Sequence, residues 1–134
     1  YLYHTACQSH QSGIPMIRPL VMEYPKDPIA KTQNLSYMLG DALLISPGFD
    51  RDEYELYLPE GRWQDIESKE VYEGMTFVHI ENKAFADGGT SLRVFQKEGT
   101  SIPLFAQKEV LHVPAQLWKQ EDLEFMTFQK KDVD

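Results

Sequence analysis

Apolar and polar residues alternate with a period of two through much of the chain after residue 42, which is the pattern of half-buried β-strands. The clearest case is EYELYLP, residues 53–59. One face would carry Tyr54, Leu56 and Leu58, and the other would carry Glu53, Glu55 and Tyr57. The run ALLISP before it, residues 42–47, is mostly apolar and predicts a buried strand that ends at Pro47-Gly48.

Further short strands follow, separated by segments rich in Gly, Pro, Asp and Asn. They are TFVHI, LRVF, SIPLF, EVLHV and LEFMTF, at residues 76–80, 92–95, 101–105, 109–113 and 123–128. Many short strands at this spacing predict an antiparallel β-sandwich or a small barrel. The fold class is therefore mainly β, and we expect the sandwich.

The first third of the chain has a different pattern. Residues 1–12 predict a helix, because Leu2, Tyr3, Ala6, Cys7 and His10 would share one face. Gly13 would end this helix. The stretch IPMIRPLVMEYPKDP, at residues 14–28, holds four prolines and predicts an extended connector, after which Asp27 could start a short helix.

The segment YLPEGRWQDIESKEVYEG, residues 57–74, predicts a hairpin. In this reading Pro59-Glu60-Gly61 turns the chain between a first strand and a second strand that carries Trp63. A single large ring on a hairpin normally covers its own sheet, so we interpret Trp63 as core and not as a ligand platform. Asp65 would accept a hydrogen bond in the turn region.

Composition and charge narrow the function classes. The 134 residues carry a formal net charge of -8, and such a surface repels phosphate backbones, so we expect no nucleic-acid partner. No apolar run approaches the ~20 residues of a membrane span. Cys7 is the only cysteine, which excludes an intrachain disulfide and favours a reducing, cytoplasmic compartment. The opening YLYHTACQSH has no signal-peptide pattern and suggests a fragment of a longer protein.

The acidic residues are interpreted as structural. Asp50, Asp52 and Glu53 would form a solvated turn, and this turn lacks the glycine and the ligand spacing of a calcium loop. Glu121 and Asp122 would lie in a polar loop. Asp41 would cap or bind the backbone before a buried strand, and contact with a neighbouring domain is the alternative.

The basic and nucleophilic residues predict no metal site and no cofactor. His4 and His10 would not share a helix face, and His79 and His112 are single residues in strands. Cys7 would pack in an apolar surrounding and would not act as a nucleophile. Arg18, in the connector, would form an ion pair that joins two parts of the protein; substrate contact is the alternative.

Four motifs in this order resemble glycoside hydrolase family 31, the α-glucosidase and α-xylosidase family. GIPMIRPLVMEYPKDP, residues 13–28, is similar to the family's segment after the last barrel helix, and YMLGDALLISP, residues 37–47, to its L-G-D strand. YLPEGRWQD at residues 57–65 resembles its Y-L-P-x-G-x-W-x-D element. LRVFQKEGTSIPL, residues 92–104, resembles its V-F…I-P-L element.

The resemblance implies a division of the chain. Residues 1–36 would be a remnant of the last barrel helix and a connector, and residues 37–134 the proximal C-terminal β-sandwich domain. The family's catalytic aspartates lie upstream on barrel strands, and their motifs are not in this sequence. The resemblance therefore implies no catalytic, substrate-binding or metal residue here, and a chain that is inactive alone.

Two functions of different class remain open. The chain is either the non-catalytic C-terminal part of a retaining α-glycosidase or an independent carbohydrate-binding sandwich; a pure interaction domain is a third possibility. The expected partner is the catalytic barrel of the parent chain, which would bring the α-linked oligosaccharide. Because the helix would present apolar residues, a homodimer through the helix is a further expectation.

Overall fold

The structure is a computed structural model that describes residues 1–49, 51–82, 92–105 and 123–131. It contains the helices α1 (Leu2–Ser12) and α2 (Leu20–Glu23) and the 3₁₀ turn η1 (Ala30–Thr32). The strands are β1 (Ile17–Pro19), β2 (Tyr37–Leu39), β3 (Leu43–Pro47), β4 (Glu53–Leu58), β5 (Arg62–Asp65), β6 (Val71–Glu73), β7 (Thr76–Glu81), β8 (Leu92–Lys97), β9 (Thr100–Phe105) and β10 (Leu123–Phe128). The predicted antiparallel β-sandwich with a short N-terminal helix is confirmed.

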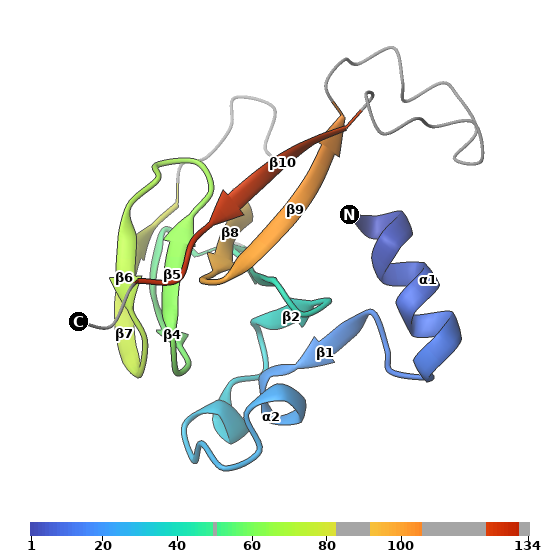
Figure 1. Cartoon of the computed structure of the whole chain (residues 1–134). Coiled ribbons are helices and arrows are strands. Elements are labelled where there is room, and N and C mark those ends of the chain that lie inside the picture. Colours follow the sequence, from blue (N-terminus) through green and yellow to red (C-terminus); the bar gives the residue numbers. More distant parts are fainter. Residues whose placement is uncertain (50, 83–91, 106–122, 132–134) are drawn as a thin grey trace.

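The strands of the described residues form three antiparallel sheets (Figure 1). The largest has six strands in the order β1-β2-β3-β8-β5-β6. The other two are the pairs β4-β7 and β9-β10. In the view of Figure 1, α1 lies to the right, on the opposite side of the molecule from β4 and β7.

The alternation within β3 explains how these sheets stack. Leu44 is fully buried in a cluster with Phe95 and with residues of β4 and β7. Its neighbours Leu43 and Ile45 point the other way, into a second cluster with Ile102. Successive strand residues face opposite sides of a sheet, so the six-stranded sheet is covered on both faces. This is why ALLISP carries apolar residues at four consecutive positions, Ala42 to Ile45, instead of alternating.

The predicted hairpin at residues 57–74 is wrong in its pairing. β4 pairs with β7, and β5 pairs with β6 and β8, so the chain changes sheet at Pro59-Glu60-Gly61. The true hairpin is β5–β6, in which Trp63 lies opposite Tyr72. A Pro-x-Gly turn between two alternating runs is compatible with a hairpin or with a crossing between layers, and local sequence does not separate the two.

Gly74 marks the place where two turns cross. A Cβ at this position would overlap the carbonyl oxygens of Pro59 and Gly61. The carbonyl oxygen of Pro59 accepts hydrogen bonds from the indole Nε1 of Trp63 at 2.9 Å and from the amide of Met75 at 3.3 Å. The motif from Pro59 to Gly74 is thus one packed unit around a buried indole.

Helix α1 forms as predicted, but a different face contacts the sandwich. Gly13 ends it in the left-handed conformation, with φ 75°, and its amide donates to the carbonyl of Ser9. Thr5 is the buried residue of the helix, whereas Leu2 is 59% exposed and Cys7 is half-buried. The expectation that Cys7 packs in a buried apolar surrounding is therefore wrong.

The connector is more regular than predicted. It includes the edge strand β1 and the single turn α2, with Pro19 at the N-cap, where its missing N–H costs nothing. The short helix expected to start at Asp27 is found as the 3₁₀ turn η1, which begins at Ala30, and the Asp27 carboxylate oxygen Oδ1 accepts from the amides of Ile29 and Ala30 at its start. The division of the chain at residue 36 stays a prediction, and the strand expected at residues 109–113 lies outside the described residues.

Candidate functional site

Two of the sequence motifs meet at the turn between β2 and β3. Gly40 occupies this turn with φ +64°, and its amide donates to the carbonyl of Met16 at 2.8 Å. A Cβ here would overlap the hydroxyl of Tyr1 and lie 3.1 Å from the side chain of Thr5. Glycine at position 40 therefore lets helix α1 approach the sheet. The positive φ of this residue is a second reason for glycine here.

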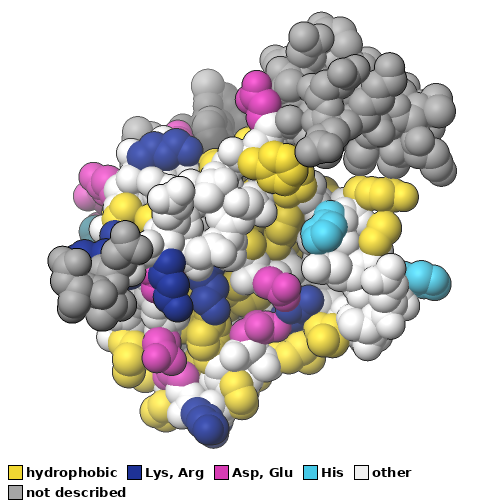
Figure 2. Space-filling model, viewed as in Figure 1, with side chains coloured by type: hydrophobic (Ala, Val, Ile, Leu, Met, Phe, Trp, Pro, Cys, Tyr) yellow, Lys and Arg dark blue, Asp and Glu magenta, His cyan; other side chains and the backbone are white. Residues whose placement is uncertain are grey.

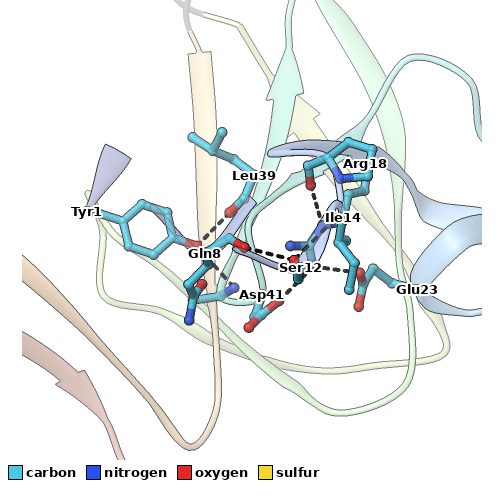
Figure 3. Close-up of polar contacts among 10 residues, drawn as sticks. Tyr1, Gln8, Ser12, Ile14, Arg18, Glu23, Leu39 and Asp41 are labelled. Carbon is cyan, nitrogen blue, oxygen red and sulfur yellow. Dashed lines mark hydrogen bonds and ion pairs between the residues drawn. The ribbon is translucent and has the colours of Figure 1, made fainter. Parts of the chain in front are cut away.

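The hydroxyl of Tyr1 ties the start of the helix to the same turn. It donates to the carbonyl of Leu39 at 2.6 Å and accepts from the amide of Ala42 at 3.2 Å (Figure 3). Burial is the main cause that raises the pKa of the Tyr1 phenol above its ordinary value. The neutral phenol thus serves as both donor and acceptor at the helix–sheet contact.

Arg18 is the polar centre of this junction (Figure 3). It is 5% exposed, and its Nε donates to the carbonyl of Pro15 at 2.6 Å. Its Nη1 lies 2.8 Å from Glu23 Oε1 and 2.6 Å from Asp41 Oδ1. Burial by itself lowers the pKa of Arg18, but the two carboxylates outweigh it and the pKa is raised. The ion pair predicted for Arg18 is present and joins the connector to the sandwich.

The interpretation of Asp41 is corrected by this contact. Among the residues that the structure describes, its carboxylate accepts from Arg18 and not from a backbone amide. The side chain is 68% exposed, which leaves it open to a neighbour. Asp41 borders an open hollow of about 320 Å³ at the end of α1. The hollow is lined by Gln8, Gln11, Ser12, Ile14, Arg18 and Asp41.

Exposed hydrophobic side chains lie on α1, β1, α2 and the segment between α1 and β1. We call the following set the docking face: Leu2, Ile14, Ile17, Val21 and Met22, which are 37–60% exposed. Figure 2 shows hydrophobic side chains on this side of the molecule, with charged side chains among them. Exposed apolar side chains on elements that follow one another in the chain suit a surface on which a partner packs.

Trp63 and Asp65 are structural, as predicted. Trp63 is fully buried. Asp65 is 1% exposed, and its Oδ1 accepts from the amides of Glu67 at 2.8 Å and Ser68 at 3.2 Å. Its Oδ2 forms an ion pair with Arg93, whose Nε lies 3.1 Å away. The buried charge is therefore paired and hydrogen-bonded, which fixes the turn between β5 and β6.

The acidic residues at the start of β4 face solvent. Asp52 and Glu53 are exposed, as predicted, but Glu53 is the first residue of the strand and not part of a turn. Glu53 and Glu55 flank His79, at 3.5 Å from its Nε2 and 2.8 Å from its Nδ1. The hydrogen bond that the Nδ1 of His79 donates to the carboxylate of Glu55 is the main cause that raises the pKa of His79. This cluster is an exposed cross-strand ion pair on β4 and β7.

The remaining predicted positions are not brought together. His4 and His10 are both exposed on α1. Asp50, His112, Glu121 and Asp122 lie outside the described residues. Within the described part of the chain, no group of three or more His, Cys, Asp or Glu side chains could hold a metal ion. None of its helices is long and apolar enough to cross a membrane.

Sequence reasoning did not anticipate that Gly40, Glu23 and Tyr1 take part in the junction. The signal was present in the R-P-L and L-G-D motifs, whose charged residues are Arg18 and Asp41. The two motifs are 23 residues apart, and only the antiparallel pairing of β1 with β2 shows that they meet.

Comparison with known proteins places the chain among large enzymes. Residues 13–109 match the family described as "Glycosyl hydrolase family 31 C-terminal domain". The human "Neutral alpha-glucosidase AB" is 35% identical over 107 residues, which is 77% of this chain and 11% of the human protein. "Alpha-glucosidase 2" of Bacillus thermoamyloliquefaciens is 34% identical over 118 residues, or 85% of this chain and 14% of the relative.

Solved structures give the same result. The cycloalternan-forming enzyme from Listeria monocytogenes, in complex with a pentasaccharide substrate, matches with a TM-score of 0.68 and 37% identity. The match covers 77% of this chain and 9% of that enzyme. A dextranase from Flavobacterium johnsoniae, complexed with glucose, matches with a TM-score of 0.65, 31% identity, and 77% and 12% coverage. The chain thus spans about a tenth of the length of these proteins.

Proposed function

The chain belongs to glycosyl hydrolase family 31 as its C-terminal domain, and from this premise we propose that it is the non-catalytic part that supports the barrel of a larger α-glycosidase. The parent enzyme would hydrolyse α-linked glucosides or xylosides by a retaining double displacement. The barrel that carries its catalytic aspartates would be the direct partner of this domain.

The observation that carries the proposal is the docking face beside the Arg18–Asp41 junction. Helix α1 is held on the sandwich through Thr5 and Tyr1, while Leu2 at its start stays 59% exposed. At ~25 cal/mol per Å² of apolar area removed from water, covering a few such side chains contributes several kcal/mol. A barrel on this side would obtain that stabilisation and would contact the helix and the sheet at once.

The carboxylates of the chain support a structural role. A retaining glycosidase needs two carboxyl groups ~5–5.5 Å apart across the scissile bond. Here Asp41 is held by Arg18, Asp65 by Arg93, and Glu55 by His79. We propose that no residue of this chain is catalytic, binds substrate or holds a metal.

The independent sugar-binding module is the second candidate. Such a module presents two or three aromatic rings together in solvent. The half-exposed rings of the described residues lie on α1, after β3, on β7 and on β10; they are Tyr3, Phe49, Phe77 and Phe125. Their distribution over four elements favours the supporting role.

Two measurements test the proposal. The purified chain should release no nitrophenol from nitrophenyl α-glucoside or α-xyloside, whereas a longer protein that includes the upstream part of the gene should do so. In that longer protein, backbone amides around the docking face should exchange with deuterium more slowly than in the chain alone. Turnover by the chain that disappears on mutating one of its own carboxylates would overturn the proposal, and so would equal exchange in both proteins.

A further inference from the structure

The charges at the junction are not balanced. Arg18 supplies one positive charge, and the two carboxylates within 2.8 Å of its Nη1, on Glu23 and Asp41, supply two negative charges. Glu23 is 30% exposed and Asp41 is 68% exposed. At present water solvates the excess negative charge, because the carboxylate of Asp41 projects from the surface next to the hollow.

Covering this surface would change that balance. Ile14 lines the same hollow and belongs to the docking face, so a partner that covers Ile14 also approaches Asp41. Removing a carboxylate from water costs several kcal/mol unless a positive or hydrogen-bonding group compensates it. Arg18 donates to both carboxylates through its Nη1, but its single positive charge balances only one of their two negative charges.

We propose that the hollow beside Asp41 receives a lysine or arginine side chain from the barrel that covers the docking face. This inference rests on the proposed function and adds the chemistry of the partner. The hollow suits such a group, because Gln8, Gln11 and Ser12 are among its lining residues and their side chains are of types that can accept hydrogen bonds. The incoming cation would bring the junction to two positive and two negative charges.

The test titrates the isotope-labelled chain with Nα-acetyl-arginine amide while the backbone amide signals are followed by NMR. The neutral isostere Nα-acetyl-citrulline amide, at the same concentrations, is the control for shape and hydrogen bonding. Amide signals of Gln11, Ser12 and Asp41 should shift several-fold more with the arginine derivative than with citrulline. Asp41→Asn should abolish this difference, and Glu67→Gln, which neutralises an exposed carboxylate on the β5–β6 turn, should retain it.

A second variant is needed in case Asp41→Asn loses its response only because its fold has changed. Gln11→Lys places a cation at the rim of the hollow, and it should weaken the response to the arginine derivative several-fold while the other amide signals stay in place. Equal shifts with arginine and citrulline would overturn the inference. A full response in both variants would also overturn it, as would glucose at the same concentrations moving these signals more than arginine does, because that result assigns the hollow to a sugar.

This outcome is separable from that of the proposed function. Docking is judged by deuterium exchange in the longer protein, and the cation by the difference between arginine and citrulline. Protection of the docking face without any preference for arginine would leave the supporting role intact and reject the cation. A preference for arginine without protection would reject the supporting role and retain a cation-binding hollow.

Discussion

The Nη1 atom of Arg18 lies 2.6 Å from the Oδ1 atom of Asp41, and this contact joins the connector to the turn that precedes β3. Because Arg18 is buried, the contact is shielded from bulk solvent on the arginine side. Asp41 is largely exposed, so the pair is worth less than a fully buried one.

Replacing Arg18 by methionine should lower the free energy of unfolding by about 2 kcal/mol, since the carboxylates lose their donor while part of the packing is kept. Urea unfolding followed by circular dichroism measures this. Lys26→Met, which removes an exposed positive charge, is the control and should stay within about 0.5 kcal/mol of the original chain. Equal stability of the two variants would mean that the junction adds nothing to the fold.

Tyr57 and Asp27 should couple folding to acid. The hydroxyl of Tyr57 donates to Asp27 Oδ2 at 2.6 Å. This bond is the main cause that lowers the pKa of Asp27, and burial together with Asp27 raises the pKa of Tyr57 to about 12. A lowered carboxyl pKa contributes stability above the unfolded value, near 3.9, and that stability is lost as the pH falls through the folded value.

The variant Tyr57→Phe should therefore be less stable than the original chain at pH 7, by about 1 kcal/mol, and should lose less stability between about pH 4 and pH 2. Urea unfolding at a series of pH values gives both quantities. Tyr72→Phe removes a hydroxyl that is bound to the exposed Glu70, and it should leave the acid dependence due to Asp27 unchanged. Parallel stability curves for the original chain and Tyr57→Phe would contradict the coupling.

Trp63 should behave as a core residue in both of two substitutions. Trp63→Ala should lower the free energy of unfolding by about 3–5 kcal/mol, because the ring is fully buried. Trp63→Phe keeps most of the volume but loses the bond to the carbonyl of Pro59, so a smaller loss of about 1–2 kcal/mol is expected. Thermal unfolding measures both. A variant that keeps its melting temperature but loses binding to an oligosaccharide would restore the platform interpretation.

Gly74 should tolerate no side chain. In Gly74→Ala the methyl group would overlap two backbone carbonyl oxygens, and backbone cannot move aside as a flexible side chain does. We expect a loss of about 3 kcal/mol in the free energy of unfolding. Gly13→Ala is the matched control, since it meets open space and costs only about 1 kcal/mol through its positive φ. If both variants lose the same amount, the crossing of the two turns is not close-packed.

Local pattern predicted the elements well and their partners poorly. The helix ending at Gly13, the strand over residues 53–58 and the burial of Trp63 follow from spacing, a single glycine and the size of a ring. The pairing of β4 with β7 does not follow, because choosing between a hairpin and a crossing depends on apolar residues more than twenty positions away. The β5–β6 hairpin could not be predicted either, because the residues between its strands, 66–70, do not show the pattern of a tight two-residue turn.

The junction shows the same limit. The sequence indicates an ion pair for Arg18 but names no partner, because Asp41 becomes adjacent only after β1 and β2 have paired. The helix shows the opposite case. Its apolar residues predict burial, yet Thr5 is the residue that contacts the sandwich, since Gly40 leaves room for a small polar side chain. The exposed Leu2 then indicates a second surface that sequence pattern could not distinguish from core.

Self-association through the docking face is the remaining prediction. The isolated chain exposes Ile17 by 60% and Met22 by 49%, and exposed apolar surface of this kind favours pairing of two copies. Sedimentation at increasing concentration should therefore show a dimer of the isolated chain. The double variant Ile17→Lys with Met22→Lys should be monomeric, because two lysines on each copy would be desolvated and would repel one another.

The control for this dimer is Phe125→Lys on β10, where the native ring is 58% exposed but lies outside the docking face. Like the double variant, it replaces a large exposed apolar side chain by lysine, but it leaves α1, β1 and α2 unchanged, so the dimer should persist. A dimer that disappears in Phe125→Lys and persists in the double variant would assign the contact to β10. If the original chain is a monomer at every concentration, then the docking face does not bind a second copy. The proposed barrel would then be the remaining partner for its exposed side chains.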